Sequence, residues 1–510
     1  NVSALLTALN AAAGAFTDKT VKGDRTLKSA SAAVAHFTRV TSERIVVNTQ
    51  YGKVSGFAAD ATTWQWLGIP YGKPPVGERR WKPPEEPESW TGTREATQWG
   101  DQAAQNPVYK AFGEGGMSED CLYLNITAPK NAKNLPVMVW FHGGGFYILT
   151  GNTVAFNNPN SLPKKNVVLV TVNHRLGAFG YLAHPWLSQE SGYNGSGNYG
   201  QMDLILALKW IKNNIANFGG DPNNVTIFGE SGGGGKVISL TCSPLAQGLF
   251  HKAIAESGGI VSPDPPATIG ALTNASTLAN AENIGVQLTN ALKVSNLAEL
   301  RSKSWQEIEQ ASRSLAWWPN VDNYYMPDSM RNIYEKGEHN DVPLLCGYNK
   351  QDLAGLEVAF RTYLPWMASK KKAPCYPYIF TKVPEGWENK VGAYHGCELL
   401  YVFNYPRSLI VHYLLGLVID PTTGSPLAIG DLNGDGKTGS QGDTADILAS
   451  AGWGTSDDVM ADTMMTIWTN FAKTGNPSTS TFTWSPYTIA NDTYVELGRT
   501  LTAKTGLSLK

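Results

Sequence analysis

Residues 226–237, TIFGESGGGGKV, join an apolar run to a turn made almost entirely of small residues. The apolar run predicts a buried strand, and the residues after the glycines predict a helix. Between them stands Ser231 in the pattern Gly-x-Ser-x-Gly, which is typical of a nucleophilic serine on a sharp strand-to-helix turn. The pattern is short enough to occur by chance. Its meaning therefore depends on what the rest of the chain places around it.

Three other interpretations of this glycine-rich segment are unfavourable. A phosphate-binding loop needs a glycine five residues before its Gly-Lys pair and a hydroxyl residue after the lysine, but Glu230 and Val237 occupy those positions. The dinucleotide-binding pattern also lacks its third glycine. A flexible joint is not expected between a buried strand and a helix. A nucleophilic serine is the interpretation that remains.

The surrounding chain repeats the alternation of strands and helices. Continuous apolar runs predict buried parallel strands, and long amphipathic stretches predict helices that cover them. The predicted strands are 135–141, 166–173, 251–258, 342–349, 375–380 and 493–498, and the clearest helices are 198–219 and 458–475. Residues 44–57 predict an antiparallel hairpin. The chain is therefore expected to be an α/β protein with a large, mostly parallel central sheet and helices on both faces.

The composition restricts the classes of function. The 510 residues are 42% hydrophobic and carry a formal net charge of −2, so nothing resembles the basic footprint of a nucleic-acid-binding protein. The apolar run 408–419 is too short for a membrane span and contains His412. None of the five cysteines shows metal-ligand spacing.

The domain organisation expected from the sequence has one large unit. Residues 1–42 are rich in Ala, Ser and Thr and predict an N-terminal arm or leader before a catalytic domain at 43–510. Within that domain, residues 429–450 are acidic and rich in glycine, which predicts a surface insertion. A secreted or periplasmic location is expected, although the first residues lack a signal-peptide pattern.

A serine nucleophile needs a base and an orienting acid, which in this topology follow the serine in the order acid, then histidine. His395 is the preferred base because it lies in a loop between two glycines. His251 and His412 fit structural roles, and His339 is expected to be solvated in a charged loop. Asp352 follows a predicted strand and is the preferred acid, with Glu357 in reserve.

The tetrahedral intermediate of acyl transfer also needs hydrogen-bond donors for its oxyanion. Residues 139–147, VWFHGGGFY, place three consecutive glycines directly after a predicted strand. Consecutive glycines allow backbone N–H groups to approach and point at a developing charge, whereas a simple tight turn does not need three. This loop is the predicted oxyanion hole.

At this point the chain resembles the type-B carboxylesterases, the cholinesterase-like branch of the α/β-hydrolases. The resemblance rests on motifs in family order between about residues 44 and 498. They are GIPYGKPPVGERRWKPP, SEDCLYLNI, FHGGGF, VTVNHRLGAFGYL, NFGGDPNNVTIFGESGG, PLLCGYNKQD, YHGCELLYVF and TIWTNFAKTGNP. The resemblance implies an α/β-hydrolase fold and ester hydrolysis without a catalytic cofactor.

The resemblance also implies roles for individual residues. Ser231 corresponds to the nucleophile, His395 to the base and Asp352 to an acid that is Glu in the family. The implied oxyanion donors are the N–H groups of Gly144, Gly145 and Gly232. Supporting residues are Glu230 and Ser257, and Arg175 with Asp203 match a structural ion pair. Candidate acyl-pocket residues are Leu315, Ala316, Trp317 and Trp318.

The sequence departs from the family at three further points. Cys121 lacks the partner of the family's first disulfide, so that bridge should be missing. Gly232 replaces the usual alanine, which suggests the same N–H donor on a looser turn. Lys236 replaces a small residue on the predicted helix, and the sequence offers no reason for it.

The acidic insertion resembles one half of a bacterial dockerin. Asp431, Asn433 and Asp435 stand at positions 1, 3 and 5 of an EF-hand-like loop, with the Lys437 carbonyl at position 7. The acid expected at position 12 is displaced by one residue, to Asp443. We expect a structural Ca²⁺ here, with a solvated turn as the alternative, and docking to a cohesin-type scaffold is not expected.

The function predicted from the sequence is hydrolysis of small carboxylic esters through an acyl-enzyme. A narrower feruloyl, toxin or polyester esterase is an alternative within the same family. A non-catalytic adhesion protein of the same fold is the alternative from another class. It is disfavoured because the serine, acid, histidine and all three glycines are present.

Overall fold

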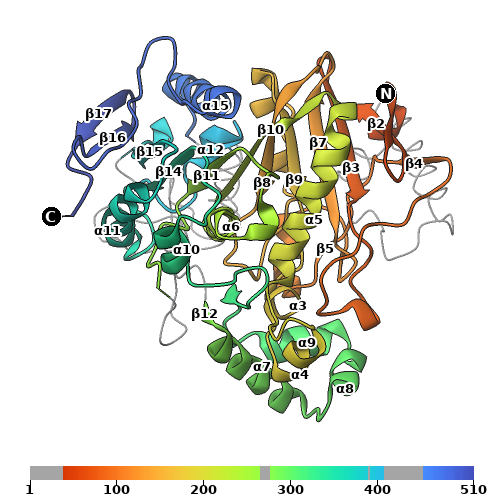
Figure 1. The fold of residues 1–510 in the computed structure, drawn as a ribbon. Helices are drawn as coiled ribbons and strands as arrows, with labels where there is room; N and C mark the ends of the chain where they lie inside the picture. Colours follow the sequence, from red (N-terminus) through yellow and green to blue (C-terminus); the bar gives the residue numbers. More distant parts are fainter. Residues whose placement is uncertain (1–37, 265–275, 389–390, 407–451, 510) are drawn as a thin grey trace, which may run out of the picture.

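A computed structural model describes residues 38–264, 276–388, 391–406 and 452–509 of the chain (Figure 1). Its centre is one 13-stranded sheet. In spatial order the strands are β1 (Arg44–Thr49), β2 (Gly52–Ala58), β3 (Thr63–Pro70), β7 (Tyr123–Pro129), β9 (Val168–Val172), β8 (Leu135–Phe141), β10 (Gly220–Glu230), β11 (Lys252–Glu256), β14 (Leu344–Asn349), β15 (Cys375–Phe380), β16 (Thr493–Leu497) and β17 (Leu501–Thr505), and β4 (Thr93–Glu95) pairs with β2.

The middle of the sheet is parallel from β9 through β16, and both edges are antiparallel. At one edge, β1 and β2 form the expected hairpin, in which Val46 faces Ser55. At the other edge, β17 returns antiparallel to β16. The predicted fold class is confirmed. The predicted strand at 493–498 is β16, and β17 follows it at the outer edge of the sheet.

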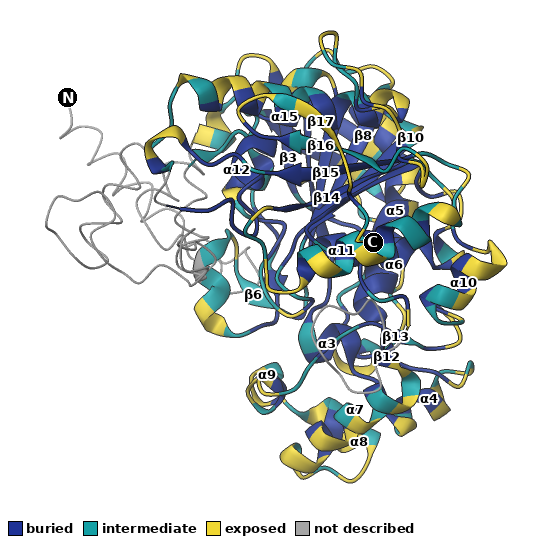
Figure 2. Cartoon of the chain, turned by 90° about the vertical axis from the view of Figure 1, so that its left-hand side faces the viewer, coloured by how far each residue is buried: buried dark blue, intermediate teal, exposed yellow. Residues whose placement is uncertain are grey.

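Side chains of β8 show how helices cover both faces of the sheet. Val137 and Val139 belong to a core shared with helices α5 (Tyr199–Asn214) and α6 (Gly232–Thr241), and with α10 (Met330–Lys336) and α11 (Leu356–Ser369). Met138 and Trp140 belong to the opposite core, with α12 (Leu399–Val402) and α15 (Thr455–Thr474). Successive strand residues point to opposite faces, so a continuous apolar run is required. Figure 2 shows these strands as a dark, buried layer.

A smaller group of helices lies beyond one end of the sheet in both views (Figures 1 and 2). It consists of α3 (Gly177–Tyr181), α4 (Pro185–Glu190), α7 (Leu278–Leu292), α8 (Leu297–Ser302) and α9 (Trp305–Ser312). Its apolar core includes Leu288, Ile308 and Trp317, together with Phe146 from the loop that follows β8. The helical group is thereby joined to the region where the parallel strands end.

Some predicted features fall on residues that the structure does not describe. Nearly all of the arm 1–42 and the whole insertion 429–450 lie outside the described residues, as does His412. The proposed division of the chain therefore stays a prediction. All five cysteines are described, and each is a buried free thiol, so no disulfide links them. Among the helices that are described, none has the length and apolarity needed to cross a bilayer.

Candidate active site

Ser231 lies on a strained turn between strand β10 and helix α6. Its backbone angles are φ 58° and ψ −121°, a conformation that a residue with a side chain rarely adopts. Its N–H donates to the Glu256 carbonyl at 2.8 Å, which ties the turn to the neighbouring strand β11. A Cβ at Gly233 would lie 2.1 Å from the Phe141 oxygen, so only glycine fits there. The glycines thus allow the turn to pack against the end of β8.

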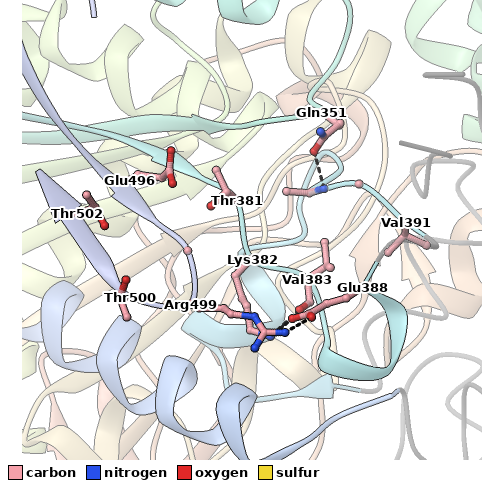
Figure 3. Close-up of a pocket in the computed structure, with 13 residues that line it drawn as sticks. Gln351, Thr381, Lys382, Val383, Glu388, Val391, Glu496, Arg499, Thr500 and Thr502 are labelled. Carbon is pink, nitrogen blue, oxygen red and sulfur yellow. Dashed lines mark hydrogen bonds and ion pairs between the residues drawn. The ribbon is translucent and has the colours of Figure 1, made fainter. Parts of the chain in front are cut away.

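His395 is held by the carboxylate of Asp352. Their Nδ1 and Oδ1 atoms are 2.5 Å apart, and both side chains are almost fully buried. The second oxygen of Asp352 accepts the backbone N–H of Asn349, at the end of β14, at 2.8 Å. The loops are joined as well, because the N–H of Gln351 donates to the Ala393 carbonyl at 3.0 Å and its side chain accepts from Ala393 at 2.8 Å. Figure 3 shows Gln351 with this contact, on the wall of a neighbouring polar pocket.

The reserve acid lies elsewhere. Glu357 is on α11 and pairs with Arg361 at 3.0 Å, with about a third of its side chain exposed (38%). Between the two candidate acids, the fold brings Asp352 and not Glu357 to the imidazole of His395.

Three further carboxylates surround this pair. Glu230 Oε1 lies 3.2 Å from His395 Nε2. Glu398, which is fully buried, accepts hydrogen bonds from the Asn349 amide and from Ser257 Oγ, the latter at 3.4 Å. Glu256 accepts from the Trp468 indole at 3.0 Å. Glu256, Glu398 and Asn349 were not predicted from the sequence. Glu398 stands three residues after His395 in the motif YHGCELLYVF, and this spacing is the sequence signal that could have identified it.

The electrostatic consequence is a basic imidazole. Burial alone lowers the pKa of His395, but the facing carboxylates of Glu230 and Asp352 outweigh burial and raise that pKa above its usual value. Burial also raises the pKa of Glu230, an effect that the His395 charge opposes. A protonated imidazole at His395 is therefore stabilised by the neighbouring carboxylates.

The glycine loop after β8 has an unusual backbone. Gly144, Gly145 and Phe146 all have positive φ, at 84°, 57° and 68°. The carbonyl of Gly144 accepts two N–H groups from the following turn, which fixes the loop. A Cβ at Gly144 would lie 2.3 Å from the Ile148 oxygen. Within the described part of the chain, the N–H groups of Gly144, Gly145 and Gly232 donate no hydrogen bond, which leaves them available to an oxyanion.

Gly232 lies directly against this loop. A Cβ at position 232 would be 2.8 Å from the Gly145 nitrogen and 3.0 Å from its Cα. The expectation of a looser turn at Gly232 stays a prediction, and what the structure shows is that the backbone of the loop occupies the space where a methyl group would be. The missing side chain allows the turn and the loop to approach each other.

The predicted acyl-pocket residues line a cavity beside the loop. Leu315, Ala316, Trp317 and Trp318 contribute to its wall, and the volume is about 410 Å³. Tyr147 and Ile148, which follow the glycine loop, form another part of the wall. The ring of Trp318 packs edge-on against Phe146, with their centroids 5.3 Å apart. The cavity therefore adjoins the candidate oxyanion hole.

The remaining predicted residues have structural surroundings. His251 accepts the Val225 N–H at 3.0 Å, and Arg175 forms a buried ion pair with Asp203 at 2.6 Å. The expectation that His339 is solvated is wrong, because its ring is buried and stacks on Tyr334 at 4.1 Å. All of the calcium candidates lie outside the described residues, and the described ones contain no cluster of metal-ligating side chains.

The strand order and the position of the serine turn define an α/β-hydrolase. Comparison with known proteins identifies the family within this fold class. The sequence pattern of the carboxylesterase family matches residues 43–362 and 447–509. The chain belongs to the carboxylesterase family, a family of carboxylic-ester hydrolases.

Individual relatives agree with this membership. Para-nitrobenzyl esterase of Bacillus subtilis (strain 168) is 32% identical over 87% of this chain and 92% of its own length. Fumonisin B1 esterase of Sphingopyxis macrogoltabida is 38% identical over 61% of this chain, but the match spans only 56% of that enzyme. A solved structure of PNB esterase superposes with a TM-score of 0.73 and 28% identity, over 90% of this chain and 96% of that one.

Proposed function

We propose that this protein hydrolyses carboxylic esters with Ser231 as nucleophile, His395 as general base and Asp352 as orienting acid. The observation that supports this proposal best is the contact between His395 Nδ1 and Asp352 in a chain whose serine lies on a strained strand-to-helix turn. Asp352 holds one ring nitrogen, so Nε2 is the nitrogen left for the Ser231 proton.

The chemistry follows from these positions. His395 takes the hydroxyl proton as Ser231 Oγ attacks the ester carbonyl, and the tetrahedral oxyanion binds the N–H groups of Gly144, Gly145 and Gly232. The intermediate collapses as His395 gives its proton to the departing alcohol, which leaves an acyl-enzyme. Water then attacks with His395 again as base and releases the acid. Glu230 stabilises the imidazolium, and Ser257 supports Glu398 below it.

A direct test uses the covalent intermediate. Mixing the protein with a p-nitrophenyl ester should release a burst of nitrophenol, and a fluorophosphonate probe should phosphonylate Ser231 Oγ with loss of fluoride and abolish turnover. Labelling of another residue with loss of turnover, or hydrolysis that survives complete labelling of Ser231, would refute the assignment.

The pH profile tests the proposed role of Glu230. Because the Glu230 carboxylate helps to raise the pKa of His395, Glu230→Gln should lower it. The base must be unprotonated, so the acidic limb of kcat/KM should move to lower pH, by about one unit. The pH–rate profile of each variant measures this. An unchanged limb, or one moved upward, would contradict the role.

We further propose that the cavity beside the glycine loop holds the acyl group. Its lining includes Leu315, Ala316, Trp317 and Trp318, and its size suits an acyl chain of modest length. Ala316→Leu should fill part of it and lower kcat/KM for p-nitrophenyl octanoate about tenfold, with little effect on the acetate ester. An equal loss on both esters would place the acyl chain elsewhere.

We propose narrower classes of ester substrate as alternatives. Two relatives are named for para-nitrobenzyl and fumonisin B1 esters, and feruloyl or polyester substrates fit the same chemistry. A panel that varies acyl and alcohol groups separately distinguishes them. A non-catalytic adhesion role would require that no ester in the panel is hydrolysed.

Two proposals rest on the sequence alone. We propose a structural Ca²⁺ held by Asp431, Asn433, Asp435, the Lys437 carbonyl and Asp443, with no metal used in catalysis. Chelation with EGTA should then lower the melting temperature, and an unchanged melting temperature would argue against the ion. We also propose a secreted or periplasmic location, which cell fractionation tests.

A further inference from the structure

Lys236 lies one helical turn after Ser231, inside the protein. Its side chain is fully buried in helix α6, and its Nζ donates to the carbonyl oxygen of His142 at 2.8 Å. The same ammonium lies 5.4 Å from the centre of the Phe146 ring. No ion pair joins it to a carboxylate among the described residues. Lys236 therefore contacts both ends of the glycine loop 142–146.

A buried ammonium without a carboxylate is unfavourable for stability. Burial lowers the pKa of Lys236 to about 7, which measures how much the charged form is disfavoured. Burial of the His142 ring lowers the pKa of that histidine, and the charge of Lys236 lowers it further. A methionine would fill the same space without this cost. The lysine therefore requires an explanation other than core packing.

The glycine loop supplies one. Gly144, Gly145 and Phe146 all have positive φ, and the two N–H groups that the Gly144 carbonyl accepts fix the loop at its far end but do not reach His142 at its start. The bond from Lys236 draws the start of the loop toward helix α6, while Phe146 packs on the same helix, 3.0 Å from where a Cβ at Gly235 would be. Gly232 is the first residue of α6, and a Cβ at this position would lie only 2.8 Å from the Gly145 nitrogen. All three contacts come from helix α6. Gly235, which packs against Phe146, and Lys236, which bonds the His142 carbonyl, follow Gly232 by three and four residues.

We propose that Lys236 is a positioning residue that holds the oxyanion loop against helix α6, and that Gly232 provides the space this position requires. The proposal rests on the proposed esterase function, because it assigns the N–H of Gly145 to the oxyanion. Lys236 acts through the His142 carbonyl and does not touch the substrate.

The first experiment is Lys236→Met, which keeps an unbranched apolar side chain, one atom shorter than lysine, and removes the donor. We expect kcat for p-nitrophenyl acetate to fall about tenfold with KM changed less than twofold, because oxyanion donors act on the transition state. The melting temperature should change little, because the lost hydrogen bond to the His142 carbonyl and the removed cost of burying the ammonium act in opposite directions. An unchanged kcat, or equal changes in KM and kcat/KM, would overturn the proposal.

A matched control is Lys371→Met. Lys371 is also a buried lysine that donates to a backbone carbonyl, that of Val342, at 2.8 Å, but it also pairs with Asp341. It precedes strand β15, at the end of the sheet opposite the serine turn. This variant should lose stability and keep its kcat within about twofold. A tenfold loss of kcat in the control as well would show that Lys236→Met acts through general loosening.

A double-mutant cycle tests the coupling between the two positions. Gly232→Ala alone should lower kcat about tenfold, because its methyl group displaces the Gly145 N–H. If Lys236 holds the loop in place, Gly232→Ala should cost less than about threefold in the Lys236→Met background, where the loop can retreat. Losses that simply multiply would show that the two positions are independent and would overturn the proposal.

A readout that does not depend on hydrolysis separates this proposal from the proposed function. Crystal structures of the protein and of Lys236→Met should show the Gly145 nitrogen moving away from the Gly232 Cα in the variant. If the protein hydrolyses no ester, the esterase proposal fails while this displacement can still be measured. A loop that stays in place in the variant overturns the positioning role whatever the activity.

Discussion

Replacing Ser231 with alanine is expected to lower kcat/KM for p-nitrophenyl acetate at least about 10⁴-fold. The reason is chemical, because no other side chain on the turn can attack the carbonyl. Only the oxyanion donors and the binding pocket would remain, and they account for a small residual rate over water. Steady-state kinetics with the purified variant measures the loss.

The same substitution should leave the fold intact. Ser231 Oγ makes no hydrogen bond to the described part of the protein, and alanine has the same backbone preference as serine at φ 58°. The melting temperature should therefore change by less than about 2 °C.

Ser239→Ala provides the matched control on the same helix. Ser239 is fully buried on α6 and its hydroxyl lies 3.0 Å from Tyr325 Oη, so its loss should reduce stability but keep kcat/KM within about threefold. If Ser231→Ala retained more than about one hundredth of the activity, the nucleophile would have to be another residue.

Asp352→Asn should have the second-largest effect, a fall in kcat of about 10³- to 10⁴-fold. The Asp352 carboxylate accepts from His395 Nδ1 at 2.5 Å, and an amide can present its NH₂ group there instead. The ring would then adopt the tautomer with its proton on Nε2, which cannot accept the proton of Ser231. The negative charge that helps to raise the pKa of His395 would also be lost. Single-turnover acylation with a p-nitrophenyl ester measures the step directly.

Glu357→Gln is the corresponding control for the acid. Glu357 pairs with Arg361 on the exposed side of α11, so this substitution should leave acylation within about threefold of the wild-type rate. The reverse pattern, with Glu357→Gln severe and Asp352→Asn mild, would refute the assignment of Asp352.

Much of the candidate site could be predicted because each candidate catalytic group is marked by its neighbours in sequence. The glycines around Ser231 and in 142–146 are requirements of local backbone geometry, and local geometry is written in adjacent residues. Asp352 and His395 follow predicted strands or stand between glycines, so their loops could be placed at one edge of a parallel sheet. Glu256 and Asn349 had no such local sign, because a buried polar side chain resembles a surface one in sequence, and Glu398 was marked only by its spacing of three residues from His395.

By itself the sequence determined the order of strands and helices, the serine turn, the glycine loop and the family to which the chain belongs. Periodicity and glycine spacing carry this information because they depend on residues close together in the chain. The packing of the tertiary structure brings Asp352 rather than Glu357 to His395, buries His339 and sets the backbone of the glycine loop against Gly232. It also gave Lys236 a partner 94 residues away, in the carbonyl of His142. These outcomes depend on distances between segments remote in sequence, which are set only when the sheet and its helices pack together.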